Sequence, residues 1–266
     1  MYNKGLFADW VPKPLMLVLI LVFLTPILVV SGIYTGNLSY MVGTLGTHNS
    51  WLVFANYAGV VGMGVSLPLI FRYKLRFHTK FLMVRTLLFL AIANFMIGTT
   101  DSVIVIVSSA FFIGFLKMFA LIELIMPTMY IISPDGNRPK FYSIFYPAAI
   151  VFPQLVGYLM TRFGFSTYWE NANFIMAIVM LSLAALAVVF MHNQRYDKKV
   201  PLKGIDWTGA FLFTGIFLAL AYIISFAKQQ NYFRSDNIML AIGIIIMGSI
   251  LYALNQNLKK DPFIHF

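Results

Sequence analysis

The sequence lacks cysteine and is poor in charged residues, acidic ones above all. Its 266 residues include no Cys, 9 Asp and Glu together, and only 11% charged residues of either sign. Without cysteine the chain forms no disulfide and no thiolate metal site. A chain that is 60% hydrophobic also has too few polar groups to cover a water-soluble globule of this size. We therefore expect an all-α integral membrane protein whose surroundings are the lipid bilayer.

Long polar stretches are missing as well. The longest break between apolar runs, residues 192–206, leaves no room for a domain outside the membrane. Between such breaks, eight apolar runs are long enough to cross a hydrocarbon layer of ~30 Å, which takes roughly 20 helical residues. They cover residues 14–35, 51–71, 81–100, 103–131, 141–161, 172–191, 208–227 and 238–258. We therefore predict about eight transmembrane helices.

Basic residues outnumber acidic ones by 19 to 9, for a formal net charge of +10. If the N-terminus is cytoplasmic, only Arg162, Lys228 and Arg234 fall in outer loops, and Lys117 lies within a helix. The remaining cations then face the cytoplasm, as the positive-inside rule requires. This asymmetry predicts a multi-pass protein of the plasma (inner) membrane with a cytoplasmic N-terminus. Because topology and anionic lipid account for the basic charge, we expect no nucleic-acid partner.

Groups that form catalytic or metal centres do not converge in this sequence. The four histidines, His48, His78, His192 and His265, fall in predicted loops or at the end of the chain, and none is one helical turn from another. The glycines of residues 59–64 lie within an apolar run, where small residues permit close helix packing and do not form a phosphate loop. We therefore expect no enzyme activity, no metal and no cofactor.

Two ionisable residues, Lys117 and Glu123, fall inside the fourth predicted helix. A charge at mid-membrane costs ~2.5–3.5 kcal/mol and usually faces a cavity or a partner. Six residues apart, the two side chains are separated by about 240° around the helix, so each needs a partner elsewhere. Glu123 then either meets a basic loop or serves as a proton or cation site. Lys117 either bonds to backbone or snorkels, or it binds an anion.

Polar and aromatic residues in the first two runs are candidates to line a solute path. Their alternative role is to form interhelical hydrogen bonds or to lie in the interfacial belt. The full set of candidates for substrate or ion binding is Lys117, Glu123, Asn37, Asn56 and Tyr34.

The junction of the second and third runs, residues 68–80, resembles the G-x-L-a-D-r-x-G-r-k signature of the major facilitator superfamily. Arg76, Phe77 and Lys80 match the basic part of that signature, whereas Leu75 stands at the family's Asp and His78 at its Gly. In the family this segment forms a cytoplasmic latch. The resemblance therefore makes Arg76 and Lys80 gating candidates.

Three later segments are similar to the 14-helix drug:proton antiporter branch of that family. Residues 152–157 keep Pro153 and Gly157 of its G-P-x-x-G-G antiporter motif, and residues 204–209, with Asp206 and Trp207, resemble the D-W-x-G start of its linker hairpin. Residues 261–264 resemble the segment that leads into its ninth helix. The acid that the branch carries in its first helix is absent, and Lys117 is the only cation near the place of its fourth-helix Arg.

The resemblance implies a division of the chain into three parts. Residues 1–192 would form an MFS-like six-helix N-terminal transport bundle, residues 193–258 a linker and a transmembrane hairpin, and residues 259–266 the start of a loop to a missing C-terminal bundle. That second bundle, the C-terminal half of the same protein, would be the main protein partner.

The function implied is secondary active transport, in which small amphipathic solutes are exported by proton-coupled alternating access, with the solute site near the bilayer midplane. Two alternatives stay open. One is uptake of an organic anion or another solute, suggested by Lys117 and the missing first-helix acid. The other is a non-transporting membrane scaffold built on the same fold.

Overall fold

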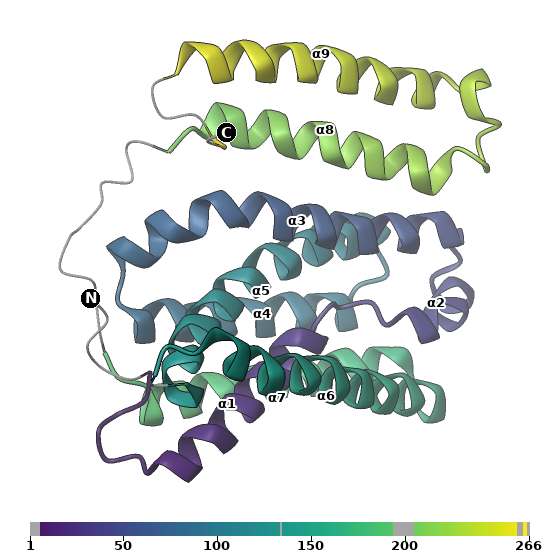
Figure 1. The fold of residues 1–266 in the computed structure, drawn as a ribbon. Coiled ribbons are helices and arrows are strands. Elements are labelled where there is room, and N and C mark those ends of the chain that lie inside the picture. Colours follow the sequence, from purple (N-terminus) through teal and green to yellow (C-terminus); the bar gives the residue numbers. More distant parts are fainter. Residues whose placement is uncertain (1–5, 134, 194–204, 260–262, 265–266) are drawn as a thin grey trace.

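The computed structural model describes residues 6–133, 135–193, 205–259 and 263–264 and is helical almost throughout them (Figure 1). The helices are α1 (Lys13–Val29), η1 (Thr35–Asn37), α2 (Leu38–Leu45), α3 (Asn49–Arg76), α4 (Thr79–Thr99), α5 (Val103–Ile132), α6 (Arg138–Ser166), α7 (Trp169–Phe190), α8 (Trp207–Phe226), η3 (Tyr232–Arg234) and α9 (Asp236–Leu258). The predicted linker residues 194–204 lie outside the described part of the chain.

Seven helices, α3 to α9, have 20 to 30 residues and are apolar enough to cross a membrane. The first predicted run differs from the rest. Its helix, α1, has 17 residues and spans about 25 Å, which is less than the ~30 Å of the hydrocarbon layer. The prediction of one helix through residue 35 was wrong, because the chain leaves the helix after Val29 and passes Gly32 with φ +74°. That backbone conformation suits glycine and interrupts a right-handed helix.

Side chains cap the starts of several helices, where backbone N–H groups lack helical partners. His48 Nδ1 accepts from the Ser50 N–H at the start of α3, at 3.3 Å. Asn137 Oδ1 accepts from the Lys140 N–H at the start of α6, also at 3.3 Å. These residues fix where the long apolar helices begin.

The helices α1 and α3 to α7 lie together, with α8 and α9 beside them as a pair (Figure 1). Helix α3 packs along α5, and α4 packs against α7 and α5, while α8 lies along α3. Aromatic rings hold this last contact: the centroids of Trp51 and Phe226 are 4.9 Å apart, and those of Phe54 and Tyr222 are 5.8 Å apart.

Glycines allow α3 and α5 to approach closely. A Cβ atom on Gly114 of α5 would overlap the backbone of Gly59 on α3, and a Cβ on Gly62 would overlap the carbonyl of Phe111. Small residues at such crossings let helix backbones come into contact within a membrane. The packing role predicted for the glycines of residues 59–64 is confirmed at Gly59 and Gly62.

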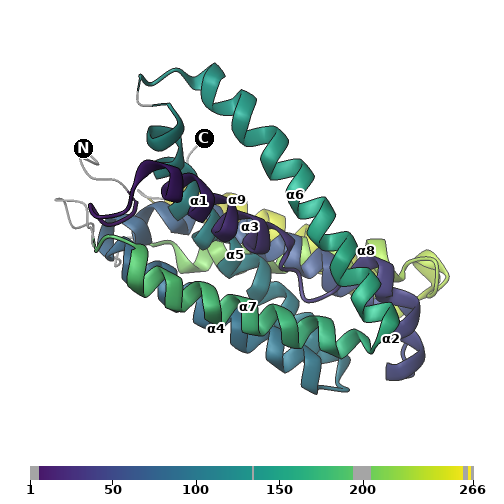
Figure 2. The same cartoon turned by 90° about the horizontal axis from the view of Figure 1, so that it is seen from below.

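Helix α6 is the least covered of the long helices and stands at the edge of the bundle (Figure 2). Only Phe141, Phe145 and Gly164 of its 29 residues are buried. Its neighbours are mainly α1 and α7. Most of its apolar surface is therefore free within the described structure.

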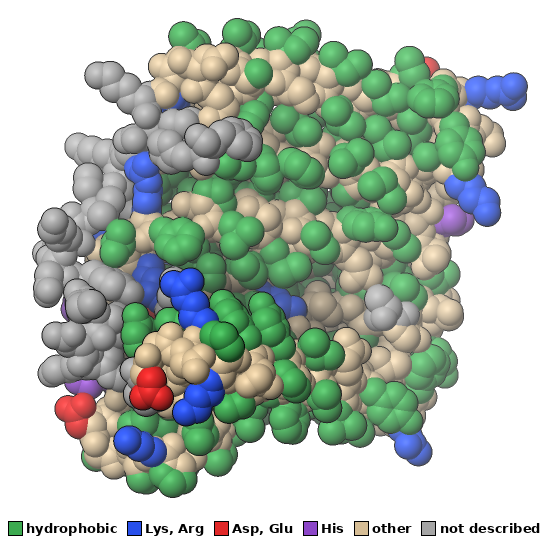
Figure 3. Space-filling model, in the orientation of Figure 1, with side chains coloured by type: hydrophobic (Ala, Val, Ile, Leu, Met, Phe, Trp, Pro, Cys, Tyr) green, Lys and Arg blue, Asp and Glu red, His purple; other side chains and the backbone are tan. Residues whose placement is uncertain are grey.

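The surface agrees with a membrane environment. Hydrophobic side chains cover much of the middle of the face in Figure 3, and most Lys and Arg side chains on that face lie toward its two ends. Helices α3 and α9 end, and α4 and α8 begin, at one end of the bundle (Figure 1).

Candidate functional site

Lys117 lies halfway along α5 and reaches the break in α1. Its Nζ donates to the carbonyl oxygen of Leu28 at 2.5 Å and to that of Val30 at 3.2 Å. The last carbonyls of a helix lack helical donors and carry a partial negative charge. The ammonium therefore satisfies carbonyl groups that are left unpaired where α1 ends.

A cavity of about 440 Å³ lies beside this contact. It is lined by the residues that follow α1, by the start of α2, by α3 and by α5, and most of its walls are apolar. Its polar side chains are those of Ser31, Asn56, Tyr57 and Lys117. Small-molecule sites of this size are common, and they combine apolar walls with a few polar groups that orient the ligand.

Among the described residues that line it, the cavity offers one charged side chain, Lys117, and no carboxylate. An ammonium in apolar surroundings attracts an anionic group strongly, because little water competes with the ligand. The carbonyls of Leu28 and Val30 hold the ammonium beside the cavity. The arrangement can therefore bind the acidic group of a small amphipathic solute while the walls contact its apolar part.

The other candidates in the first helices divide between two places. Asn56 lines the cavity with Lys117, whereas Tyr34 and Asn37 are buried elsewhere. The Tyr34 hydroxyl and both amide atoms of Asn37 have no hydrogen-bond partner in the described structure, and the Asn37 side chain lies where a Cβ on Gly164 would be. The structure thus brings two of the predicted solute-binding residues together and leaves these two apart.

Glu123 meets a partner on a different helix. Its Oε2 lies 3.5 Å from Nζ of Lys74 on α3, and the two side chains are 1% and 6% exposed. Lys74 also donates to the carbonyl of Ile122 at 3.3 Å. Lys117 and Glu123 therefore have separate partners, as their angular separation predicts. The alternative in which Glu123 meets a basic loop named the right kind of partner. It misplaced that partner, because the second run was expected to end at residue 71 and Lys74 lies instead within α3.

The residues of the predicted latch and antiporter motif lie apart from the cavity. Arg76 is the last residue of α3 and is exposed, and Lys80 is half-buried in the first turn of α4. Pro153 and Gly157 are half-buried residues of α6, and a Cβ on Gly157 would meet open space. This glycine therefore allows no close backbone contact among the described residues.

Asp206 joins the two ends of the α8–α9 hairpin. It caps α8 by accepting from the Gly209 N–H at 3.0 Å, and it accepts from Asn255 Nδ2 of α9 and from Lys259 Nζ just after α9, each at 2.5 Å. Its side chain is 1% exposed, whereas neighbouring Trp207 is 47% exposed. Burial alone would raise the pKa of Asp206, but the donors from Lys259, Gly209 and Asn255 lower it below its ordinary value of 3.8.

Replacing Asp206 by Asn should destabilise the hairpin by about 1–3 kcal/mol at neutral pH, because buried donors lose a charged acceptor. The lowered folded-state pKa means that the carboxylate's contribution is complete above 3.8 and is lost as the pH falls through the folded value. Wild-type protein should therefore keep this contribution down to about pH 4 and lose it as the pH falls further below 3.8, and D206N should lose less. Thermal unfolding in detergent checks this, with exposed Asp236→Asn as the control; equal acid sensitivity of D206N and wild type would contradict it.

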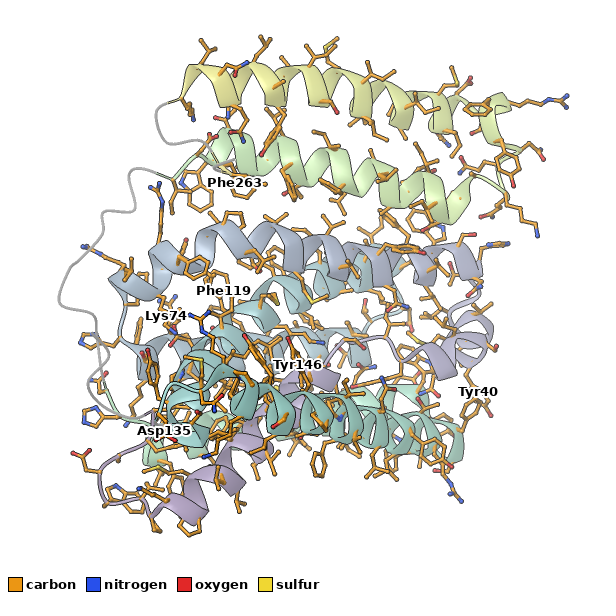
Figure 4. The ribbon with its side chains drawn as sticks, in the orientation of Figure 1. Tyr40, Lys74, Phe119, Asp135, Tyr146 and Phe263 are labelled. Carbon is orange, nitrogen blue, oxygen red and sulfur yellow. The ribbon has the colours of Figure 1, made fainter. Side chains whose placement is uncertain are left out.

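Of the predicted resemblance to the segment before a ninth helix, only Phe263 and Ile264 are described, and Asp261 and Pro262 lie outside the described residues. Phe263 is buried, with its ring centroid 5.6 Å from that of Phe213 on α8. Phe263 therefore lies against the first half of α8 (Figure 4).

Seven long apolar helices with a mostly apolar surface define a multi-pass α-helical membrane protein. No group of three or more His, Cys, Asp or Glu residues that could hold a metal is found in the described part of the chain. No protein-family model and no curated protein matches the sequence.

Proposed function

We propose that the chain is the N-terminal transport bundle of a secondary active transporter of the major facilitator type, with its solute site in the cavity beside Lys117. The observation that carries the proposal is this cavity of about 440 Å³, which adjoins the break in α1 and the middle of α5. Broken helices near the bilayer midplane are a feature of solute sites in secondary transporters.

The solute class that fits the cavity is a small amphipathic molecule, and Lys117 favours one with an anionic group. Proton-coupled export of amphipathic solutes is the function that the family resemblance implies. Transport of an organic anion is the second candidate, and the observation that favours it is that Lys117 is the only charged side chain among the described residues lining the cavity. In either case Glu123, held by Lys74 outside the cavity lining, is the candidate for a proton-coupled step.

The proposal assigns roles to the remaining parts. Helices α1 to α7 form the transport bundle, α8 and α9 form the linker hairpin, and a second bundle from the same protein completes the solute path. Arg76 and Lys80 act in a cytoplasmic latch, which requires a cytoplasmic N-terminus in the plasma (inner) membrane. The alternative is a non-transporting scaffold on this fold, and the experiment described next distinguishes it from a transporter.

The test is flux in proteoliposomes that contain the full-length protein. Carboxyfluorescein serves as an organic anion and ethidium as an organic cation, each with and without an imposed pH gradient. We expect protein-dependent flux of an amphipathic dye, with the anion preferred if Lys117 binds the solute. Flux that ignores the gradient would exclude proton antiport, and no flux of either dye above protein-free vesicles would overturn the transporter proposal in favour of the scaffold.

Replacing Lys117 by Met should reduce anion flux by about 10-fold to 100-fold, the loss expected when one hydrogen bond to a charged group, worth ~1.5–3 kcal/mol, is removed. Lys117→Arg keeps the charge and should retain most of the flux. Lys140→Met, on the exposed surface, is the matched control. If both K117M and E123Q transport as the wild type does, Lys117 and Glu123 have a structural role and not a role in transport.

A further inference from the structure

A second hollow, separate from the cavity beside Lys117, is lined mainly by aromatic side chains. It has a volume of about 310 Å³ and lies among the end of α3, the first three turns of α4 and the middle of α5. Its aromatic residues are Tyr73, Phe77, Phe81, Phe89, Phe115 and Phe119. Phe119, labelled in Figure 4, lies close to α3 in that view. Among the described residues, the hollow shares no lining residue with the first cavity.

We propose that this aromatic groove binds one anionic phospholipid of the surrounding bilayer, with the headgroup phosphate on Arg85 and part of an acyl chain along the rings. The inference does not depend on transport, because it concerns an outer surface of the bundle. It rests on the position of Arg85, on its freedom from carboxylates within the described structure, and on the apolar groove beside it.

Arg85 is held in place by rings one helical turn on either side of it. Its guanidinium carbon lies 5.0 Å from the centroid of Phe81 and 6.0 Å from that of Phe89. Such cation–π contacts orient the planar guanidinium and leave its N–H groups free for a further partner. Arg85 is itself exposed, as are both rings.

No carboxylate pairs with Arg85 among the residues that the structure describes. The acid on α5, Glu123, is buried and paired with Lys74. The end of α3 and the first turn of α4 add Arg76 and Lys80, and residues 76–80 include no acid. This surface is therefore positive, and a planar guanidinium matches the geometry of a phosphate group.

The depth of Arg85 also matches a lipid phosphate. It is six residues after the start of α4 at Thr79, which places it about 9 Å along the helix axis. From that depth the long Arg85 side chain can extend toward the start of α4 and place its guanidinium near the boundary between headgroups and hydrocarbon, where basic pockets between helices bind acidic headgroups. The aromatic walls extend from there toward the middle of the layer, where an acyl chain runs.

Net charge favours an anionic phospholipid over a zwitterionic one. Both carry a phosphate, but the choline of a zwitterionic headgroup would face Arg76 and Lys80 with like charge. Each basic residue near the membrane surface contributes about 1 kcal/mol to the binding of anionic lipid. Arg85 alone should therefore favour the anionic lipid by about five-fold.

Native mass spectrometry of the purified full chain in dodecyl maltoside tests this inference. The protein is titrated with dioleoyl phosphatidylglycerol and, separately, with dioleoyl phosphatidylcholine. We expect the wild type to bind the glycerol lipid with several-fold preference, Arg85→Gln to lower that affinity about five-fold, and Arg85→Lys to keep most of it. Arg138→Gln, at the exposed start of α6, is the matched control and should bind as the wild type does.

Three results would overturn the inference. Equal binding of the two lipids to the wild type would show that the groove has no preference for an anionic lipid. This comparison uses the wild type alone, so it does not depend on whether a variant folds. Loss of binding in R138Q as large as that in R85Q would show general attraction to a basic surface. Displacement of the lipid by carboxyfluorescein would assign the groove to a solute.

Discussion

Lys74→Met should destabilise the folded protein by about 3–5 kcal/mol, the cost of leaving one member of a buried ion pair without its partner. Lys74 Nζ lies 3.5 Å from Glu123 Oε2, and both side chains are buried. Removing the ammonium also removes the donor to the Ile122 carbonyl. Unfolding in detergent by increasing sodium dodecyl sulfate measures the loss.

Two further variants show whether this cost comes from the pair. In K74M/E123M both charges are replaced by apolar side chains, and such replacements are often nearly neutral, so the double variant should recover much of the lost stability. Lys140→Met breaks a solvated contact of 3.9 Å to Asp135 and should change stability by less than about 1 kcal/mol. A double variant as unstable as K74M would contradict the ion-pair explanation.

Gly114→Val should prevent α3 and α5 from packing, at a cost of about 3 kcal/mol or more. A Cβ at this position would overlap the Gly59 backbone on α3, and a backbone cannot move aside as a flexible side chain can. The two helices carry the cavity beside Lys117 between them, so solute binding should be lost with the packing. Size-exclusion chromatography and thermal unfolding in detergent detect the change.

The control for this prediction is a glycine in open space. A Cβ atom on Gly157 of α6 or on Gly243 of α9 would meet no other described atom within 4 Å, so Gly157→Val and Gly243→Val should leave the elution profile unchanged. If these variants aggregate as readily as G114V, the effect reflects helix propensity or solubility. If G114V behaves as the wild type, the close approach of α3 and α5 is not required.

The long helices were predictable because each is an apolar run bounded by polar residues, and lipid admits few other structures for such runs. The end of α1 was not predictable in the same way. Gly32 lies within an apolar stretch, where a glycine indicates close packing as readily as a break. Only the backbone conformation, φ +74° at this residue, distinguishes the two.

The candidate site was predictable as a set of unusual residues and not as a set of contacts. Lys117 and Asn56 stand out because polar groups are costly in apolar runs. The partners of Lys117 are backbone carbonyls, which every residue possesses, so no sequence pattern marks them. Asp206 bonds to Asn255 and Lys259, which are 49 and 53 residues away in the sequence. A single sequence does not show which residues at such separations lie close together.

Helix α6 has a consequence for what surrounds the bundle. Pro147 and Pro153 lie inside it, and each lacks the N–H that would bond to the carbonyl four residues earlier. Ser143 and Ala149 therefore have carbonyl oxygens without a helical donor, on the helix that other helices cover least. Acyl chains offer such oxygens nothing, whereas water or another polypeptide can donate to them. Because these two oxygens are six residues apart, they face different sides of α6. At each of them lipid is a poor neighbour, and a wet path or a protein that donates a hydrogen bond there lowers the free energy.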